Sequence, residues 1–321
     1  MHETLKQIGD MGIIPVVKIE DPAKALPLAK ALKDGGLPCA EITFRTGAAK
    51  EAIQNIAKVH PDMLLGAGTV LSAAQADDAV AAGARYIVSP GFNPAVVSHC
   101  VKKGIPIIPG CSTPSDMERA IEAGLEAVKF FPAGESGGVN YIKAVSAPFP
   151  MLKFIPTGGV SAENLNSYLS LNAVLACGGS WMVKAELINE GRFDEIAALT
   201  RKALNTMLGF NLSRLGFNTA DGESAGSTAG LWEKFFDFPL RQGDSSVFAG
   251  PWFEHLNAPG PGKHGHIVIG TLTIHRAVAW LKRRGYGFRD ESAETNSKGE
   301  LTGMYLKDEI AGFAIRLVQS Q

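Results

Sequence analysis

The sequence predicts an α/β protein in two parts, a (β/α)8 TIM barrel over residues 1–208 and a smaller α+β domain over residues 209–321. Two observations predict the barrel: short apolar runs alternate with helical patterns, and each run is followed by a helix-start signal. Strands that are apolar throughout and joined by helices indicate a parallel sheet. Eight such units over about 200 residues indicate a closed barrel. The competing open, doubly wound sheet usually has fewer strands and a glycine-rich first turn, which is absent here.

The eight apolar runs are residues 13–19, 39–44, 64–70, 86–90, 106–110, 127–132, 153–158 and 173–179. After each run stands Ser, Thr, Asp or Asn, sometimes followed by proline, which is the N-cap chemistry expected at the start of a helix. The predicted caps are Asp21, Thr46, Ser72, Asn93, Thr113, Ser136, Ser161 and Ser180. Gly83 and Gly124 follow helical patterns and are predicted C-caps.

Composition excludes several classes of function. The net charge of −1 gives no reason to expect binding to nucleic acid or to an acidic membrane surface. None of the apolar runs reaches the length of a membrane span, and the first residues open an amphipathic segment rather than a signal peptide. The four cysteines form no C-x-x-C pair. We therefore expect reduced core thiols and a cytoplasmic protein.

A lysine interrupts the sixth apolar run, in Val128-Lys129-Phe130. In isolation such a lysine would be expected on a solvent-facing edge strand, because charged side chains are seldom buried without a partner. On a barrel strand, however, Lys129 can point into a closed interior. Burial there disfavours the ammonium form and leaves more free amine near neutral pH. A desolvated amine attacks ketones and forms a Schiff base.

The second run supplies a carboxylate that can meet this amine. Alternation along a strand places Glu41, Thr43 and Arg45 on one face. If that face is the interior, Glu41 and Lys129 can converge, which is the arrangement needed for proton transfer beside a carbonyl. The planar fork of Arg45 suits a substrate carboxylate. The alternative for Glu41 and Arg45 is an ion pair on the surface.

Paired glycines follow the seventh and eighth runs, at Gly158-Gly159 and Gly178-Gly179. Bare backbone amides and helix N-termini bind phosphate, and barrels often place a phosphate at this position. Short helices are predicted to begin at Ser161 and Ser180. The alternative is turn geometry, since glycine is needed wherever φ is positive. Two such pairs after these two strands favour phosphate binding.

Taken together, seven motifs resemble the class I 2-keto-3-deoxy-6-phosphogluconate (KDPG) aldolases, which are often bifunctional with 4-hydroxy-2-oxoglutarate (KHG) aldolase activity. The resemblance runs in order from about residue 5 to about residue 205. Its motifs are residues 41–46 (EITFRT), 66–70 (GAGTV), 89–91 (SPG), 109–110 (PG), 129–133 (KFFPA), 156–160 (PTGGV) and 178–181 (GGSW).

The resemblance implies cleavage of KDPG to pyruvate and glyceraldehyde 3-phosphate in a homotrimer, with no metal and no cofactor. It implies Lys129 as the Schiff-base lysine and Glu41 as the general acid and base. The other implied residues are Arg45 and Thr69 at the substrate carboxylate, Pro90 and Phe131 along the pocket, and Thr157, Gly158, Gly159, Gly178, Gly179 and Ser180 around the phosphate. The alternatives are the galactonate-derived substrate, or a barrel that binds phosphosugars without turnover.

After residue 208 the sequence indicates loops at 218–227 and 257–263 and two β-α-β-like stretches. The predicted elements are strands 212–218, 266–271, 303–306 and 312–318, and helices 228–238 and 274–285. This pattern resembles the paired βαβββ modules of the glyoxalase/bleomycin-resistance superfamily. Metal-binding members carry ligands on the first and last strands of each module, where this chain has Arg214 and Arg316. His266 and Glu254 alone would underfill a divalent site. We therefore expect a metal-free domain for small-molecule binding or oligomer contact.

Overall fold

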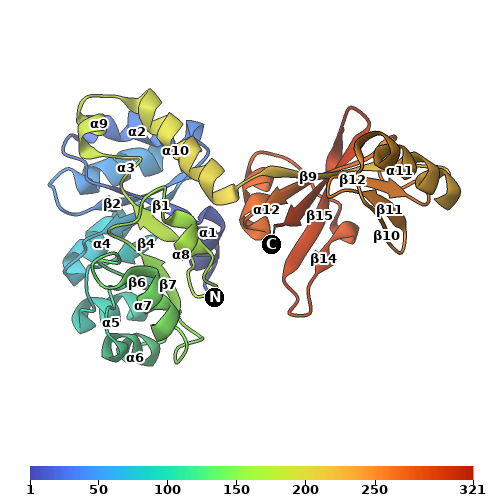
Figure 1. Cartoon of the computed structure of the whole chain (residues 1–321). Helices are drawn as coiled ribbons and strands as arrows, with labels where there is room; N and C mark the ends of the chain where they lie inside the picture. The colour runs from blue at the N-terminus through green and yellow to red at the C-terminus, as the bar shows by residue number, and fades with distance from the viewer. Residues whose placement is uncertain (321) are drawn as a thin grey trace. The chain divides into compact units, whose positions relative to one another are not determined.

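The computed structural model describes residues 1–320, and the chain divides into two compact units, Met1–Met207 and Leu208–Gln321. Each unit has its own sheet (Figure 1). Within residues 1–320, no helix is both long enough and apolar enough to cross a bilayer.

The first unit is a closed parallel barrel. Its strands are β1 (Ile13–Val17), β2 (Cys39–Thr43), β3 (Leu64–Gly68), β4 (Tyr86–Val88), β5 (Ile107–Ile108), β6 (Ala127–Phe130), β7 (Lys153–Pro156) and β8 (Cys177–Gly179). Hydrogen bonding gives the order β5-β4-β3-β2-β1-β8 and a separate β6-β7 pair. Bridges from Gly110 to Lys129 and from Thr157 to Gly178 join β5 to β6 and β7 to β8. The predicted eight-stranded barrel is therefore confirmed.

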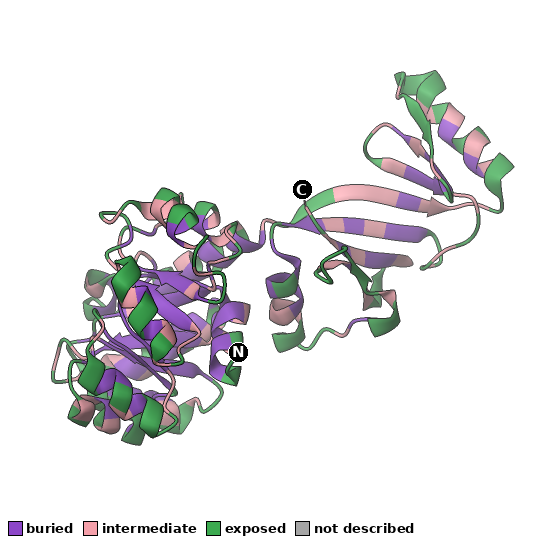
Figure 2. Cartoon of the chain, turned by 90° about the horizontal axis from the view of Figure 1, so that it is seen from below, coloured by how far each residue is buried: buried purple, intermediate pink, exposed green. Residues whose placement is uncertain are grey.

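Helices alternate with these strands and surround them. They are α1 (Glu3–Met11), α2 (Ala25–Asp34), α3 (Ala49–Val59), α4 (Ala73–Ala81), α5 (Pro94–Lys102), α6 (Pro114–Glu122), α7 (Gly138–Val145), α8 (Leu165–Leu169), α9 (Ala185–Asn189) and α10 (Phe193–Leu208), with a short 3-10 turn at Pro22–Lys24. The strands are buried, and the outward faces of the helices are exposed (Figure 2). Gly83 and Gly124 follow α4 and α6 with φ of 111° and 76°, as expected of C-caps.

Half of the predicted helix starts are correct. The side chains of Asp21, Ser72, Asn93 and Thr113 accept hydrogen bonds from the first turns of the helices that follow them. The remaining predicted caps, Thr46, Ser136, Ser161 and Ser180, do not cap a helix.

The two helices expected to begin at Ser161 and Ser180 begin later, so this prediction was wrong. After β7 the N–H of Ser161 donates to the side chain of Asn164, which closes a turn and delays α8 until Leu165. After β8 a turn at 181–183 precedes α9, which starts at Ala185. Both helices have only 5 residues. The segments that follow β7 and β8 at the mouth of the barrel are therefore turns rather than helix ends.

The second unit repeats the order β-α-β-β-β. The first repeat is β9 (Asn211–Asn218), α11 (Gly222–Phe236), β10 (Leu240–Gln242), β11 (Ser246–Ala249) and β12 (Phe253–Leu256). The second is β13 (Gly265–Thr271), α12 (Ile274–Arg283), a 3-10 turn (Asp290–Ser292), β14 (Glu294–Thr295), β15 (Leu301–Ile310) and β16 (Phe313–Gln319). One mixed sheet results, in the order β10-β11-β12-β9-β13-β16-β15-β14. The predicted α+β architecture is confirmed.

Two details of the second unit differ from the sequence-based expectation. Helix α11 starts at Gly222, inside the segment 218–227 that was expected to be a loop. Its N-terminus is fixed by Asp221, whose carboxylate accepts from the N–H of Ser224. The short strands β10, β11, β12 and β14 were not predicted, because they have only two to four residues each.

Candidate active site

A buried amine and a buried carboxylate meet inside the barrel. Nζ of Lys129 on β6 donates to Oε1 of Glu41 on β2 at 3.1 Å, and the two residues are 6% and 4% exposed. In the closed strand order, β2 and β6 stand on opposite sides of the barrel. The pair therefore spans the barrel interior, as the sequence predicted for these two side chains.

The neighbours of Lys129 explain why it points inwards. Val128 and Phe130 flank it on β6 and are fully buried. Phe130 stacks on Tyr141 of α7, with ring centroids 5.3 Å apart, so this side chain faces the helical layer. Because side chains alternate along a strand, Lys129 must face the interior.

The space around the pair is nearly filled. The small cavity that Lys129 and Glu41 line has a volume of about 10 Å³, and its other walls include Ile8 of α1, Tyr86 of β4 and Thr157 after β7. Space of that size holds at most about one water molecule. The pair is therefore held by packing, and a substrate must approach from the open end of the barrel.

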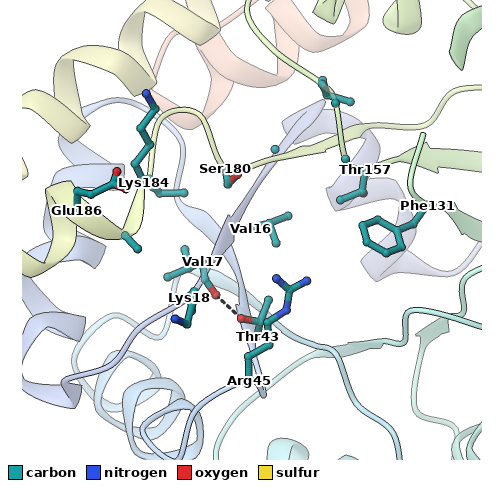
Figure 3. A pocket seen from close by; sticks show the side chains of 16 residues that line it. Val16, Val17, Lys18, Thr43, Arg45, Phe131, Thr157, Ser180, Lys184 and Glu186 are labelled. Atoms are coloured by element: carbon teal, nitrogen blue, oxygen red, sulfur yellow. Dashed lines mark hydrogen bonds between the residues drawn. The ribbon is translucent and has the colours of Figure 1, made fainter. Parts of the chain in front are cut away.

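A larger cavity of about 510 Å³ lies at that open end, at the carboxyl ends of the strands (Figure 3). Thr157 lines both this cavity and the small one below it. Of the predicted site residues, the larger cavity is also lined by Arg45, Phe131, Gly158, Gly159, Gly179 and Ser180. The carboxyl end of a barrel is where its chemistry is expected.

Arg45 is held at the rim by Thr69. Its Nε donates to Oγ1 of Thr69 at 3.2 Å. In Figure 3 the guanidinium extends into the space between Val16 and Phe131. Thr69 has φ of 57°, a left-handed conformation that is unfavourable for a β-branched residue. Such strain persists where the surroundings fix it, and it is common at ligand sites.

Glycine is required after β7 and after β8 for two different structural reasons. Gly158 and Gly159 have φ of 87° and 75°, which other residues rarely adopt. Gly178 and Gly179 have no such φ, but a Cβ atom would lie 2.4 Å from Oγ1 of Thr157 at the first and 1.8 Å from the Trp181 ring at the second. The turn explanation thus accounts for the first pair of glycines and close packing for the second. Phosphate binding remains a prediction.

Three predicted residues, Thr69, Pro90 and Gly178, line neither the larger nor the smaller cavity. Thr69 reaches the larger cavity only through its bond to Arg45. Pro90 follows β4 and is exposed. A Cβ atom on Gly110 would lie 2.0 Å from the carbonyl oxygen of Pro90, so the backbones of the two residues are close together. Gly178 contacts the side chain of Thr157.

Two lysines that sequence reasoning missed line the larger cavity, Lys18 and Lys184. Lys18 directly follows β1, so its place at the carboxyl end of a barrel strand could have indicated it. It pairs with Glu20 at 2.7 Å. Lys184 follows the turn after β8, and its amine points away from Ser180 in Figure 3. No sequence motif marks this second lysine.

These groups form a coherent chemical set. A buried amine bound to a carboxylate suits imine formation followed by proton transfer. A guanidinium at the rim suits a carboxylate, and the exposed amides of glycine turns suit an anion such as phosphate. Within residues 1–320, no group of three or more His, Cys, Asp or Glu side chains is placed so that it could hold a metal ion.

Comparisons with known proteins agree on one family. The family model for KDPG and KHG aldolase matches residues 4–199. A 2-dehydro-3-deoxy-phosphogluconate aldolase of Treponema pallidum is 50% identical over 192 residues, which is 60% of this chain and 91% of that protein. The KHG/KDPG aldolase of Escherichia coli K12 is 41% identical over 60% of this chain and 90% of its own.

Among solved structures, a KDPG aldolase of Legionella pneumophila, with pyruvate captured as a covalent carbinolamine intermediate, has a TM-score of 0.60. It is 39% identical and covers 62% of this chain and 97% of its own. The family model ends at residue 199, before the second unit begins at Leu208.

Proposed function

Because the chain belongs to the KDPG and KHG aldolase family through residues 4–199, we propose that it is a Schiff-base aldolase that cleaves KDPG to pyruvate and glyceraldehyde 3-phosphate. It also cleaves 4-hydroxy-2-oxoglutarate to pyruvate and glyoxylate. The observation that carries this function is the buried contact of 3.1 Å between Lys129 and Glu41. A barrel that only bound phosphosugars would need neither group inside.

We propose Lys129 as the nucleophile. Its neutral amine attacks the C2 ketone of the substrate and forms a carbinolamine, and loss of water gives an iminium. The carbinolamine captured with pyruvate in the Legionella relative supports this order of steps. The iminium is an electron sink, so bond cleavage at the neighbouring carbons needs no metal ion. In this role Lys129 must release its proton, and the carboxylate of Glu41 is the adjacent acceptor. Glu41 then gives that proton to the carbinolamine hydroxyl, which leaves as water, so its carboxylate is ionised again before the carbon chemistry begins.

We propose Glu41 as the base and then the acid of the carbon chemistry. It takes the proton of the C4 hydroxyl, directly or through one water molecule. The C3–C4 bond then breaks, its electron pair moves into the iminium, and the aldehyde product leaves. The resulting enamine of pyruvate is protonated at C3, and hydrolysis of the imine frees pyruvate and Lys129. Each proton that Glu41 accepts is thus returned within the cycle.

The remaining assignments orient the substrate. We propose that Arg45, supported by Thr69, binds the carboxylate of the pyruvyl portion, because a guanidinium matches two oxygens. Phe131 and Pro90 flank the carbon chain. The phosphate binds to amides at Gly158, Gly159, Gly178 and Gly179 and to the hydroxyl of Ser180, with Thr157 beside it. The 510 Å³ cavity at the barrel mouth is large enough for a six-carbon phosphosugar acid.

The gluconate-derived sugar is our preferred substrate over the galactonate-derived sugar, which differs in stereochemistry at one carbon. The relatives at 50% and 42% identity, both named phosphogluconate aldolases, support this choice. A comparison of turnover for the two sugars tests it directly.

Two further properties are proposed from the family resemblance and the cysteines. We propose a homotrimer, which light scattering would detect as three times the 34.0 kDa of one chain. We also propose a cytoplasmic location. In support of that location, all four cysteines are buried, and burial raises the pKa of Cys100 to about 11 and of Cys111 to about 12. These thiols are poorly disposed to form disulfides.

The decisive experiment is reduction with borohydride in the presence of pyruvate, followed by intact-mass measurement and peptide mapping. Only the iminium is reduced to a stable adduct, so one pyruvate-derived addition at Lys129 is expected. The Lys129→Arg variant should remain folded, form no adduct and lose turnover, because a guanidinium stays protonated. An adduct at another lysine, or an active protein without an adduct, would overturn the assignment.

A further inference from the structure

The sheet of the second unit has one face that its helices do not cover. Trp232 of α11 donates to His255 at 3.0 Å and stacks on Phe253, with ring centroids 4.0 Å apart. At the other end of the sheet, the N–H of Ile274 at the start of α12 donates to Gln319. Side chains alternate along a strand, and the strand register places these contacts on one face. The intervening residues point to the opposite, helix-free face.

Each of the four central strands places one ionisable side chain on this helix-free face. They are Glu254 of β12, Arg214 of β9, His266 of β13 and Arg316 of β16. Their strands are adjacent in the order β12-β9-β13-β16. Gly216 pairs with both Glu254 and His266, and Val268 pairs with both Arg214 and Arg316. The two arginines therefore flank β13 in the same row.

The imidazole of His266, two residues before Val268 on β13, is buried with unused hydrogen-bonding capacity. Its side chain is 4% exposed, and neither ring nitrogen has a hydrogen-bond partner. Oε2 of Glu254 lies 3.5 Å from Nε2. Gly216 provides the room, because a Cβ atom there would lie 2.4 Å from Cε1 of His266. A buried polar group of this kind requires a partner, so its position indicates a ligand.

Each arginine contacts a carboxylate on the side that faces away from β13. Nε of Arg214 lies 3.0 Å from Oε2 of Glu254, without hydrogen-bond alignment. Nη2 of Arg316 donates to both carboxylate oxygens of Glu294, and its Nε is buried without a hydrogen-bond partner. Glu254 and Glu294 lie on strands outside the row of the two arginines. Each carboxylate thus fixes one edge of a guanidinium and leaves donors available to a ligand.

We propose that the helix-free face of the second unit binds a small dicarboxylate, with one carboxylate on Arg214, the other on Arg316, and the His266 imidazole in the next row of the central strand β13. The two arginine backbones are two strand spacings apart, about 10 Å, which their long side chains can close to a shared ligand. A planar fork of donors matches a carboxylate. The side chains of Arg214 and Arg316 are 31% and 17% exposed, so a small anion can reach them.

A metal ion fits these residues poorly. Two cationic side chains stand beside the two potential ligands, Glu254 and His266, and two ligands leave a divalent ion underfilled. The positive charge of the same two arginines instead favours an organic anion as the ligand of this face.

Calorimetric titration of the full-length protein with succinate tests the proposal. We expect saturable binding of one succinate per chain, and at least tenfold weaker binding of acetate, which can engage only one guanidinium. Arg214→Gln and Arg316→Gln should each weaken succinate binding at least tenfold. Arg284→Gln, an exposed arginine of the same unit, removes the same charge and should change the affinity less than twofold.

Two controls keep the outcome unambiguous. Arg45→Gln removes the guanidinium of the barrel site, so loss of succinate binding in that variant alone would locate the ligand in the barrel and overturn the proposal. Arg214→Lys and Arg316→Lys keep the charge but lose the planar fork, and they serve if the glutamine variants do not fold. Absence of saturable succinate binding, or tighter binding of inorganic phosphate than of succinate, would also overturn it.

Discussion

Gly68 leaves the space that the carboxylate of Glu41 occupies: a Cβ atom at Gly68 would lie 2.2 Å from Oε1 of Glu41. The two residues are on neighbouring strands, β3 and β2, and the carboxylate reaches Lys129 only because the strand beside it has no side chain at this point. The proposed general base is therefore positioned by a glycine that belongs to the motif at residues 66–70.

Gly68→Ala should accordingly reduce turnover far more than stability. The added methyl group meets the flexible end of Glu41, so the carboxylate rather than the backbone has to move away. A displaced general base costs about 10² to 10⁴ in rate. Gly230→Ala is the matched control, because a Cβ atom there meets nothing within 4 Å. Turnover close to that of the parent in Gly68→Ala would show that Glu41 tolerates the shift.

Glu41→Gln should still form the Schiff base but exchange the methyl protons of pyruvate slowly. The amide is nearly the same shape as the carboxylate and can accept from Lys129, but it cannot take a proton. A general base contributes about 10² to 10⁴ in rate. Borohydride trapping measures imine formation, and deuterium exchange followed by NMR measures proton transfer. Exchange at the parent rate would require another group to be the base.

Ser180→Ala should separate the two substrates. The Ser180 hydroxyl is exposed at the mouth of the 510 Å³ cavity, so its removal disturbs little packing. A hydrogen bond to a charged group contributes about 1.5 kcal/mol or more, so kcat/KM for KDPG should fall about tenfold. 4-Hydroxy-2-oxoglutarate has no phosphate, and its kcat/KM should stay within about twofold. Equal losses on both substrates would remove Ser180 from the phosphate site.

Gly179→Val tests the phosphate site less specifically than Ser180→Ala does. The Cβ atom would lie 1.8 Å from the ring of Trp181, so the variant perturbs packing as well as any bound phosphate. We expect both substrates to lose turnover, together with a lower melting temperature. A selective loss on KDPG with an unchanged melting temperature would show that Trp181 moves aside easily.

The barrel could be predicted because its strands are buried on both faces and therefore read as continuous apolar runs. Lys129 and Glu41 stood out because each interrupts such a run. The starts of α8 and α9 could not be placed from the serines after β7 and β8, because the side chain of Asn164 closes a turn first in one case and a turn at 181–183 comes first in the other. Serine is common both in such turns and at helix N-caps, so its presence alone does not distinguish the two.

Other features could not be predicted because they depend on contacts between residues that are far apart in the sequence. Tyr86 is an ordinary aromatic residue in its strand, and only the closed barrel places it beside Glu41 and Lys129. Gly66 makes room for it, since a Cβ atom there would lie 2.2 Å from the Tyr86 ring. In the second unit, β10 to β12 are too short for a periodic pattern, and the packing of Val247 of β11 against Ala225 and Ala229 of α11 is seen only in the folded chain.

Tyr86→Phe should stabilise the barrel. The Tyr86 hydroxyl is buried and has no hydrogen-bond partner in the protein. Burial, with a further contribution from the charge of Glu41, raises the pKa of Tyr86 well above its ordinary value, so the group stays a neutral phenol. An unsatisfied buried hydroxyl costs about 1 kcal/mol or more. Its removal should raise the melting temperature by about 2–4 °C for a unit of this size. A decrease would show that a water molecule bridges the hydroxyl.

The second unit should be dispensable for the aldolase chemistry. Every residue of the proposed mechanism lies before residue 181, and the eight strands of the barrel close without any part of residues 209–321. A chain of residues 1–208 keeps α10, which ends at Leu208, and so retains the helical layer of the barrel. We expect it to fold and to keep the parent kcat for KDPG within about threefold, well short of the 10² to 10⁴ contributed by a general base. The Lys129→Arg variant of the same short chain is the inactive control. A folded barrel that binds pyruvate but turns over no substrate would show that the second unit completes the site.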